Sequence, residues 1–505
     1  MMSRARALPL LTTTLACVAP ALAQNLDLDK VGGALGGTTT MQLAGNPGEF
    51  YAILLDYQEQ STYLPALGVT LDIRDIYASL SFNLPGFSGV TDASGAASAS
   101  AVIPNDPALA SLTLSLQAVA YGSTWSVSNL VRITPQAAGT FAPLRSQPAV
   151  PISGGGVVAG ADNELLFVGG SGPVAQTLRT RTEDWSAAGA TFGVGLLSQT
   201  TTLADGRVLF TGGLDLLTGQ PTAAAAVYDP ATQTTTTLAM GTARAGHGAS
   251  LLGNGKVLVT GGSSALNLSN PLSLFTGILV STELFDPATD TFSPGPNMLE
   301  ARAMHTSTTL TNGNVLIAGG ITLIPFLNIP TVSATAYRFN PSNNSFGFPS
   351  TFGGGRFLHS AVALDNGKVL LCGGINIDFT QFLTTLNIQD LIINTRTDCQ
   401  VYTPGILNFG TFATVNGMQE GRAGAALAAL PNGGALMAGG FQLAIDAQTQ
   451  TFVFGATATA DVLGQNTITA TGSMAAPRLF PLAVNLPDGT VLVVGGGGNA
   501  EVYQR

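Results

Sequence analysis

Short apolar runs alternate with tight turns along most of the chain, and many of the runs end in two consecutive glycines. Runs this short, bounded by Gly-Gly, Asn-Gly and Asp-Gly, predict β-strands joined by tight turns rather than helices. The glycine doublets recur at intervals of 43 to 66 residues, which predicts a repeat architecture. The doublets are Gly169-Gly170, Gly212-Gly213, Gly261-Gly262, Gly319-Gly320, Gly373-Gly374, Gly439-Gly440 and Gly495-Gly496.

Three of the repeat units are close copies of one another. They run from Arg244 to Gly262, from Arg302 to Gly320 and from Arg356 to Gly374. In each unit an arginine lies eleven residues, and a histidine eight residues, before the glycine of an Asn-Gly turn. The runs on either side of this turn predict the first two strands, and a segment such as Ala225–Pro230 predicts a third strand that turns into a fourth. Each unit therefore predicts an antiparallel sheet of four strands.

These units resemble the kelch-repeat β-propeller family, in the form found in the central domain of galactose-oxidase-like proteins. The resemblance covers residues 139–505 and implies an all-β, kelch-type β-propeller. Seven blades are favoured and six is the alternative, because the first unit has Asp162-Asn163 in place of the turn and lacks the motif arginine and histidine. The last unit ends after its third strand, and Gly139–Pro143 resembles the outer-strand sequence Thr291–Pro294. We therefore expect residues 140–144 to complete the last blade.

The segment before the repeats lacks the glycine period. Residues 24–136 contain apolar or alternating runs, such as Phe50–Tyr57 and Leu112–Tyr121, separated by turn sequences. This pattern predicts an N-terminal β-sandwich domain, and it resembles the small accessory domains found at the front of secreted proteins. The domain carries no catalytic motif.

Residues 1–23 have the order of a secretory signal peptide: two arginines, a short apolar stretch and the small-residue site Ala21-Leu22-Ala23. We therefore expect a secreted protein, whether extracellular, periplasmic or on the cell surface. No later run is long enough to span a bilayer, which predicts no transmembrane segment in the mature chain. Cys17 leaves with the signal peptide, so Cys372 and Cys399 remain as a candidate disulfide or as two buried thiols.

Composition and charge narrow the classes of partner. Hydrophobic residues make up 45% of the 505 residues and charged residues only 10%, so the chain can bury a large core. The formal net charge is −10, and there is no run of lysine or arginine able to neutralise a phosphate backbone. Nucleic acid is therefore not expected as a partner.

The repeated arginines and histidines are the candidate ligand-binding residues. The entrance to the first strand and the connection from the second to the third strand lie at the same end of an antiparallel sheet, so these side chains share one face of the predicted propeller. An arginine ring there could bind a carboxylate or an oxygen-rich glycan, or the arginines could instead satisfy carbonyl groups between blades. The candidates are Arg244, His247, Arg302, His305, Arg356, His359, Arg422 and Arg478.

The sequence gives less support to a catalytic function than to a binding function. The copper site of the galactose-oxidase family needs a tyrosine directly before a histidine and a tyrosine crosslinked to a cysteine. This chain has no Tyr-His doublet, and its three histidines all occupy repeat positions. Positions repeated around a ring diverge from one another, which disfavours a shared metal. No metal, cofactor or catalytic residue is therefore expected.

Apolar insertions follow the second strand in three consecutive units, at Leu266–Val280, Ile321–Ile329 and Ile375–Ile393. They indicate either a contact surface on the same face or loops that pack on each other or on the N-terminal domain. The function that follows is a secreted, non-catalytic binding protein whose ligand is a glycan or a protein. The alternative is a galactose-oxidase-like extracellular carbohydrate enzyme.

Overall fold

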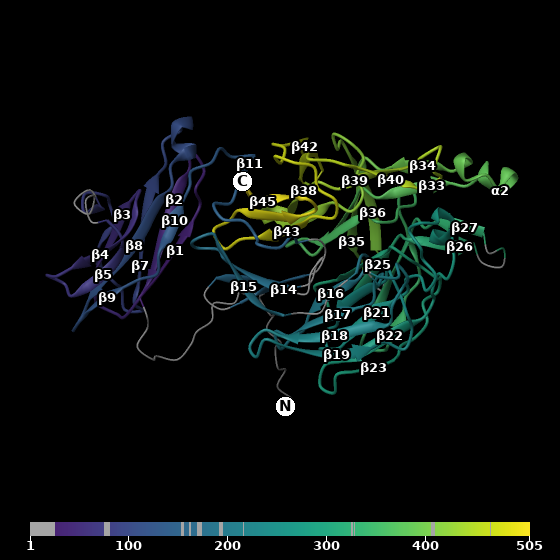
Figure 1. The fold of residues 1–505 in the computed structure, drawn as a ribbon, viewed down its shortest axis with the longest axis horizontal. Helices are drawn as coiled ribbons and strands as arrows, with labels where there is room; N and C mark the ends of the chain where they lie inside the picture. The colour runs from purple at the N-terminus through teal and green to yellow at the C-terminus, as the bar shows by residue number, and fades with distance from the viewer. Residues whose placement is uncertain are drawn as a thin grey trace, which may run out of the picture. The chain divides into compact units, whose positions relative to one another are not determined.

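The computed structural model describes residues 26–74, 81–152, 156–160, 163–168, 174–190, 195–215, 217–324, 327, 329–405, 410–464 and 466–505. Within these residues the chain is all-β, as predicted, and consists of many small antiparallel sheets (Figure 1). The predicted signal peptide, residues 1–23, lies outside the described residues. Among the residues described, no helix is long and apolar enough to cross a membrane.

The chain folds as two compact units. One contains Thr40–Ala101 and Thr113–Ile133 together with the described residues before Val31. The other contains Val31–Thr39, Val102–Leu112 and all later residues from Thr134 to Arg505. The predicted domains, 24–136 and 139–505, therefore stay a prediction, because two short N-terminal segments are grouped with the repeats.

The N-terminal strands form two sheets and a separate hairpin. In the larger sheet Ala52, Leu54 and Val119 bury their side chains against Leu71 and Ile73 of the hairpin. The strands are β1 (Asp27–Val31), β2 (Thr38–Ala44) and β7 (Ala96–Val102) in one sheet; β10 (Val131–Ile133), β8 (Leu114–Tyr121), β3 (Phe50–Asp56), β6 (Ser88–Val90) and β9 (Trp125–Val127) in the other; and β4 (Glu59–Leu64) with β5 (Val69–Ile73) in the hairpin. A short 3₁₀ helix, η1, covers Pro107–Ser111.

Seven antiparallel sheets, called sheets I to VII here, follow in the described part of the chain. Figure 1 shows their strands side by side, for example β16 to β19 of sheet II in blue-green. Their strands are: I, β12 (Gly156–Ala159), β13 (Glu164–Val168), β14 (Val174–Arg179), β15 (Asp184–Ala190); II, β16 (Gln199–Thr202), β17 (Val208–Thr211), β18 (Ala224–Asp229), β19 (Thr234–Ala239); III, β20 (Gly248–Leu251), β21 (Val257–Thr260), β22 (Thr282–Asp286), β23 (Thr291–Pro294); IV, β24 (Thr306–Thr309), β25 (Val315–Ala318), β28 (Thr335–Asn340), β29 (Ser345–Phe346), β30 (Ser350–Thr351); V, β31 (Ser360–Ala363), β32 (Val369–Cys372), β35 (Asp398–Pro404), β36 (Gly410–Asn416); VI, β37 (Ala426–Leu430), β38 (Gly434–Ala438), β41 (Ala460–Leu463), β42 (Ile468–Ala470); VII, β43 (Leu482–Asn485), β44 (Val491–Gly495), β45 (Gly498–Gln504), β11 (Thr140–Pro143).

The local sequence explains the first hairpin of these sheets. Gly255, Gly313 and Gly367 adopt φ values of 84°, 80° and 78°, which glycine reaches without steric cost, and so close the tight turn. The second strands that follow, such as β21, β25 and β32, are buried along their whole length because they are covered on both faces. Their continuous valine and leucine runs are the apolar runs that precede each glycine doublet.

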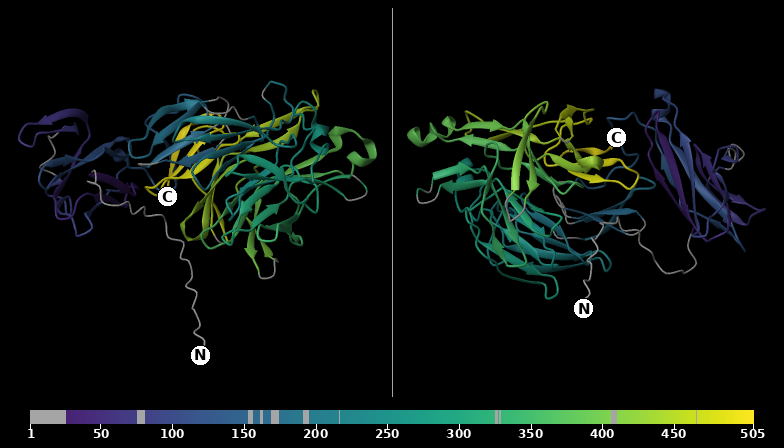
Figure 2. Two further views of the ribbon diagram at one scale, coloured as in Figure 1. Left: turned by 90° about the horizontal axis from the view of Figure 1, so that it is seen from below. Right: turned by 180° about the vertical axis from the view of Figure 1, so that it is seen from behind.

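Apolar clusters fill the space between each sheet and the next. Each cluster takes residues from two sheets that follow one another in the chain, and one further cluster joins sheet VII to sheet I. In Figure 2 the yellow strands of sheet VII lie next to the blue strands of sheet I. Representative members are Val168 and Phe210 (I and II), Val227 and Val257 (II and III), Leu258 and Ile317 (III and IV), Leu316 and Val369 (IV and V), Cys372 and Met437 (V and VI), Leu436 and Val491 (VI and VII), and Leu492 and Phe167 (VII and I).

The last sheet takes its fourth strand from a distant part of the chain. Strand β11 pairs antiparallel with β45, and Thr140 lies opposite Gln504 while Pro143 lies opposite Glu501. The expectation that residues near 140–144 complete the last sheet is therefore confirmed. This pairing covers the edge that β45 would otherwise expose.

Additional hairpins extend from the connections between second and third strands in sheets IV, V and VI. The corresponding connection of sheet III carries a short 3₁₀ helix, and Figure 1 shows the hairpins together with α2. These elements are η2 (Pro271–Phe275), β26 (Ile321–Ile324), β27 (Ile329–Val332), β33 (Ile375–Asp378), α2 (Phe382–Thr385), η3 (Ile388–Asp390), β34 (Ile392–Thr395), β39 (Phe441–Ile445) and β40 (Phe452–Ala456); η5 (Pro431–Gly433) lies in the turn before β38.

Candidate functional site

The five repeated arginines lie inside the sheets. Each is fully buried, and each donates from its guanidinium group to the carbonyl oxygen of the first glycine of its own unit's doublet. Each also pairs with a carboxylate. These pairs are Arg244 with Glu283 (2.7 Å), Arg302 with Glu300 (2.9 Å), Arg356 with Asp398 (2.7 Å), Arg422 with Asp461 (2.8 Å) and Arg478 with Glu501 (2.6 Å).

This placement answers the choice that the sequence left open for the arginines. Their side chains satisfy carbonyl groups, but within one sheet rather than between neighbouring sheets. With no exposed surface, the guanidinium groups have no face to present to a ligand. The structure therefore gives Arg244, Arg302, Arg356, Arg422 and Arg478 a structural task.

The backbone of the same arginines joins neighbouring sheets. The carbonyl oxygen of Arg302 in sheet IV accepts a hydrogen bond of 2.8 Å from the N–H of Gly262 in sheet III. A side chain at Gly261 would place its Cβ 2.3 Å from that same oxygen, so only glycine fits there. The same hydrogen bond links Gly213 to Arg244, Gly320 to Arg356, Gly374 to Arg422 and Gly440 to Arg478. The glycine doublet of one sheet and the motif arginine of the next sheet thus form one backbone contact, which we call the joint between sheets.

Sheets VII and I show the corresponding contact. A Cβ on Gly495 would lie 2.3 Å from the carbonyl oxygen of Ile152, which precedes β12 by the same number of residues as Arg478 precedes β43. Ile152 therefore takes the arginine's position in the unit whose motif is degenerate.

The three motif histidines also connect sheets, through their side chains. Nε2 of His247 lies 2.8 Å from the hydroxyl of Thr211, and Nε2 of His305 lies 2.9 Å from the hydroxyl of Thr260, in each case in the preceding sheet. Nε2 of His359 also lies 2.8 Å from a hydroxyl of the preceding sheet, but this is Thr306 at the start of the first strand, β24. Burial and, to a lesser extent, the adjacent arginine charge lower the pKa of His247 and of His305 to about 3. The same causes hold the pKa of His359 well below its usual range.

The histidines do not come together as a metal centre. In the described part of the chain, no group of three or more histidine, cysteine or carboxylate side chains is arranged to hold a metal ion. Each imidazole is instead held by a hydroxyl group of the sheet before it. Neutral, buried imidazoles of this kind are suited to packing and hydrogen bonding.

A cavity of about 800 Å³ opens at the end of the sheets where the arginine and histidine positions lie. His247, His305 and His359 line part of its wall. Strands β16 and β24 run away from this end, so Thr200 and Thr308 lie deeper in the cavity than Leu197 and Met304. Among the described residues that line it, none is a lysine, arginine, aspartate or glutamate. The cavity is therefore an uncharged site.

The two ends of the cavity differ in polarity. The deep part is formed by the hydroxyl and amide side chains of Gln199, Thr200, Ser307 and Thr308. The mouth is apolar, and its lining includes Leu274, Leu443, Phe452, Phe454, Leu479 and Phe480. Several of these residues come from β39 and β40, a fourth insertion that the sequence analysis did not single out. The alternation of Phe441, Leu443 and Ile445 was the signal that could have revealed it.

The insertions pack on each other. Leu266, Ile321, Phe379, Phe382 and Phe441 belong to one apolar cluster that runs across the insertions of sheets III to VI. The edge of the Phe275 ring faces Phe379, with ring centroids 5.0 Å apart. Of the two interpretations of the apolar insertions, mutual packing is therefore observed. Several tip residues nevertheless stay exposed, namely Leu272, Val280, Ile324, Leu327, Leu383, Leu386, Ile392, Val453 and Phe454.

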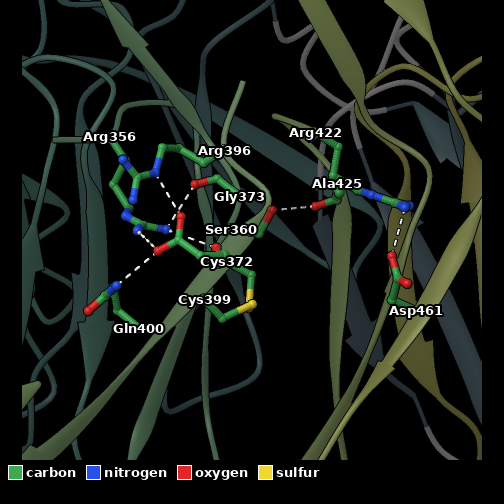
Figure 3. Close-up of a disulfide and its surroundings, with 11 residues drawn as sticks. Arg356, Ser360, Cys372, Gly373, Arg396, Cys399, Gln400, Arg422, Ala425 and Asp461 are labelled. Carbon is green, nitrogen blue, oxygen red and sulfur yellow. Dashed lines mark hydrogen bonds and ion pairs between the residues drawn. A yellow bond between two sulfur atoms is a disulfide. The ribbon is translucent and has the colours of Figure 1, made fainter. Parts of the chain in front are cut away.

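Cys372 and Cys399 lie directly opposite each other on β32 and β35, and their sulfur atoms are bonded (Figure 3). Both side chains are fully buried. The bond lies at the base of the insertion that contains β33, α2, η3 and β34. Figure 3 also shows Asp398, next to Cys399, receiving hydrogen bonds from Arg356, Arg396 and Gln400.

Comparison with known proteins leaves the family open. No family model matches the chain, and no curated protein matches it. Among solved structures, YjhT shares 13% identity with a TM-score of 0.40, over 70% of this chain and 94% of its own. A fungal alcohol oxidase of the AA5 family, solved with copper, shares 16% identity with a TM-score of 0.37, over 62% of this chain and 74% of its own. Similarity this low carries no argument about activity.

Proposed function

We propose that sheets I to VII are the blades of a closed, seven-bladed propeller of the kelch type. Three observations support this proposal over the six-bladed alternative. Apolar clusters join every sheet to the next and sheet VII to sheet I. The contact between Gly495 and Ile152 repeats the joint found between the other sheets. Strand β11 completes sheet VII from the beginning of the repeat region.

On this scaffold, the protein acts as a non-catalytic binding protein that takes a ligand into the central cavity. The observation that carries the proposal is the cavity itself, which has about 800 Å³ of space, an apolar mouth and an uncharged polar interior. A concave site with an apolar lining and a few convergent polar groups is typical of a ligand pocket. The buried arginines act beneath it as structural supports.

We further propose the other properties that the sequence predicts. Secretion, the N-terminal sandwich of residues 24–136, and a glycan or protein partner fit the all-β chain. The hypothesis that paired guanidinium donors of the motif arginines bind a glycan loses its support, because these arginines are buried. The alternative function is a galactose-oxidase-like carbohydrate enzyme.

A cavity-filling substitution tests the binding proposal. Thr308 lines the cavity and its hydroxyl makes no hydrogen bond to a described residue, so Thr308→Trp should narrow the cavity without removing a hydrogen bond of the fold. Nile red, an uncharged dye that fluoresces in apolar surroundings, should bind the full chain saturably, and Thr308→Trp should weaken this binding several-fold. Thr236→Trp on the exposed strand β19 is the matched control and should bind as the parent does. An affinity for the dye that is unchanged in Thr308→Trp would contradict the proposal.

A further inference from the structure

The polarity of the cavity changes along its length, and this restricts the chemistry of its ligand. The hydroxyl groups of Thr200 and Thr308 and the amide of Gln199 make no hydrogen bond to the described residues, and all three side chains are only partly buried. They are therefore free to donate to and accept from a ligand group that reaches the deep end. Ser307 differs from them, because its hydroxyl already shares a hydrogen bond of 2.6 Å with Ser250.

Among the described residues that line the cavity, no charged side chain could pair with a charged group of a ligand at this depth. Each buried arginine near the site is paired with its own carboxylate, and the lining histidines are held neutral by burial. Moving a carboxylate or an ammonium group out of water without an opposite charge is far more costly than burying an amide or hydroxyl that gains hydrogen bonds. The deep end therefore selects against both signs of charge.

The mouth has the opposite character. Phe454 belongs to both the mouth of the cavity and the group of exposed apolar tips, so apolar surface continues from the hairpins into the cavity. Phe452 and Leu443 extend this surface toward the interior. An apolar chain lying along it would leave water on contact with the protein.

We infer that the ligand is an uncharged amphiphile, whose hydrogen-bonding head group lies among Gln199, Thr200 and Thr308 and whose apolar chain lies along the mouth at Phe454. This inference rests on the proposed binding function and adds to it a ligand class and an orientation. Among ligands with the same apolar chain, the charge of the head group should decide the affinity. The contacts of the chain should contribute equally to the binding of each ligand.

A series of three compounds with one chain length tests the inference at pH 7.5: decanamide, decanoate and decylammonium. Their affinity for the full chain is measured by displacement of Nile red and by calorimetry. Decanamide should bind at least about tenfold more tightly than either charged compound, because the charged head groups must be desolvated without a partner. Equal affinities, or a preference for either charged compound, would overturn the inference.

Two variants separate head-group contacts from chain contacts. Thr308→Val should weaken decanamide by about fivefold, through loss of one neutral hydrogen bond, and leave the two charged compounds unchanged. Phe454→Ala should weaken all three compounds by a similar factor, and Thr236→Val on β19 is the control that should change none. A uniform effect of Thr308→Val on all three compounds would contradict the assigned orientation.

A wrong binding proposal and a wrong ligand class would give different results in these experiments. If Nile red does not bind saturably, or binds Thr308→Trp as tightly as the parent, the cavity is not a ligand site and both the proposed function and the inference are wrong. If the dye binds and Thr308→Trp weakens its binding, but the protein does not distinguish the three head groups, only the ligand class is wrong.

Discussion

The carbonyl oxygen of Arg302 lies 2.8 Å from the backbone nitrogen of Gly262, across the boundary between sheets III and IV. The guanidinium group of the same arginine donates to the carbonyl oxygen of Gly319 in its own sheet, at 2.7 Å. Arg302 thus donates a hydrogen bond to its own sheet through its side chain and accepts one from the preceding sheet through its backbone. Four further arginines make the same two contacts, which explains why the arginine and the glycine doublet recur together.

Replacing the first glycine of a doublet should break this joint. Gly261→Ala places a methyl group only 2.3 Å from the Arg302 carbonyl oxygen, at a residue whose φ is 57°. We expect the free energy of unfolding to fall by about 3 kcal/mol or more, through backbone strain and the clash together. Urea denaturation of the full chain measures this loss.

Gly255→Ala is the matched control for that substitution. Its φ is also positive, at 84°, but a Cβ there meets nothing within 4 Å. It should cost only the conformational strain, about 1 to 2 kcal/mol. Equal losses of unfolding free energy in the two variants would show that the joint between sheets contributes nothing to stability.

The Arg422–Asp461 pair should behave as a buried ion pair, because both side chains are completely buried and lie 2.8 Å apart. Arg422→Met leaves the Asp461 carboxylate without its partner, and we expect a loss of about 3 to 5 kcal/mol in unfolding free energy. The double variant Arg422→Met, Asp461→Leu should recover most of this loss, since no unpaired charge remains. A double-mutant cycle, with each variant unfolded by denaturant, measures the coupling energy between the two side chains. Additive losses in unfolding free energy would refute the buried ion pair.

The buried histidines should make the fold sensitive to acid well above the carboxylate range. In the fold the pKa of His247 and His305 lies at about 3, against an ordinary value of 6.5. The unfolded chain therefore binds more protons as the pH falls below 6.5, so the free energy of unfolding should decrease from there toward pH 3. Asp398, whose pKa is held at about 2 by Arg396, Arg356 and Gln400 against the opposing effect of burial, loses its stabilising effect only below 3.8.

Unfolding measured at several pH values between 7 and 5 isolates the histidine contribution. His305→Gln keeps a hydrogen-bonding side chain beside Thr260 but cannot titrate, so its unfolding free energy should fall less steeply with acid than that of the parent. A parent protein whose stability is constant over this range would contradict the buried, neutral state of the histidines.

The disulfide should stabilise the insertion of sheet V from its base. It closes a loop of 27 residues that contains β33 and β34, and constraining such a loop in the unfolded chain is worth about 3 to 4 kcal/mol. Non-reducing peptide mapping should recover Cys372 and Cys399 in one linked peptide. The Cys372→Ala, Cys399→Ala variant should lose stability by the stated amount, and free thiols in the parent would refute the pairing.

The sequence by itself determined the all-β class, the repeat units and the partner of the last strand. These features depend on short-range backbone geometry, which neighbouring residues specify through glycine doublets, Asn-Gly turns and apolar runs. Residues 140–143 could be matched to the open last unit because their pattern repeats that of Thr291–Pro294. The arginine and histidine positions were also visible, although their tasks were not.

Only the tertiary structure decided what those positions do. Whether Arg356 reaches a ligand or a carboxylate depends on Asp398, which lies 42 residues away in the chain and 2.7 Å away in the fold. The cavity depends in the same way on Thr200, Thr308 and Phe454, which come from three different sheets or their insertions. Burial, ion pairing and cavity shape arise from contacts between distant segments, and no local pattern of residues specifies them.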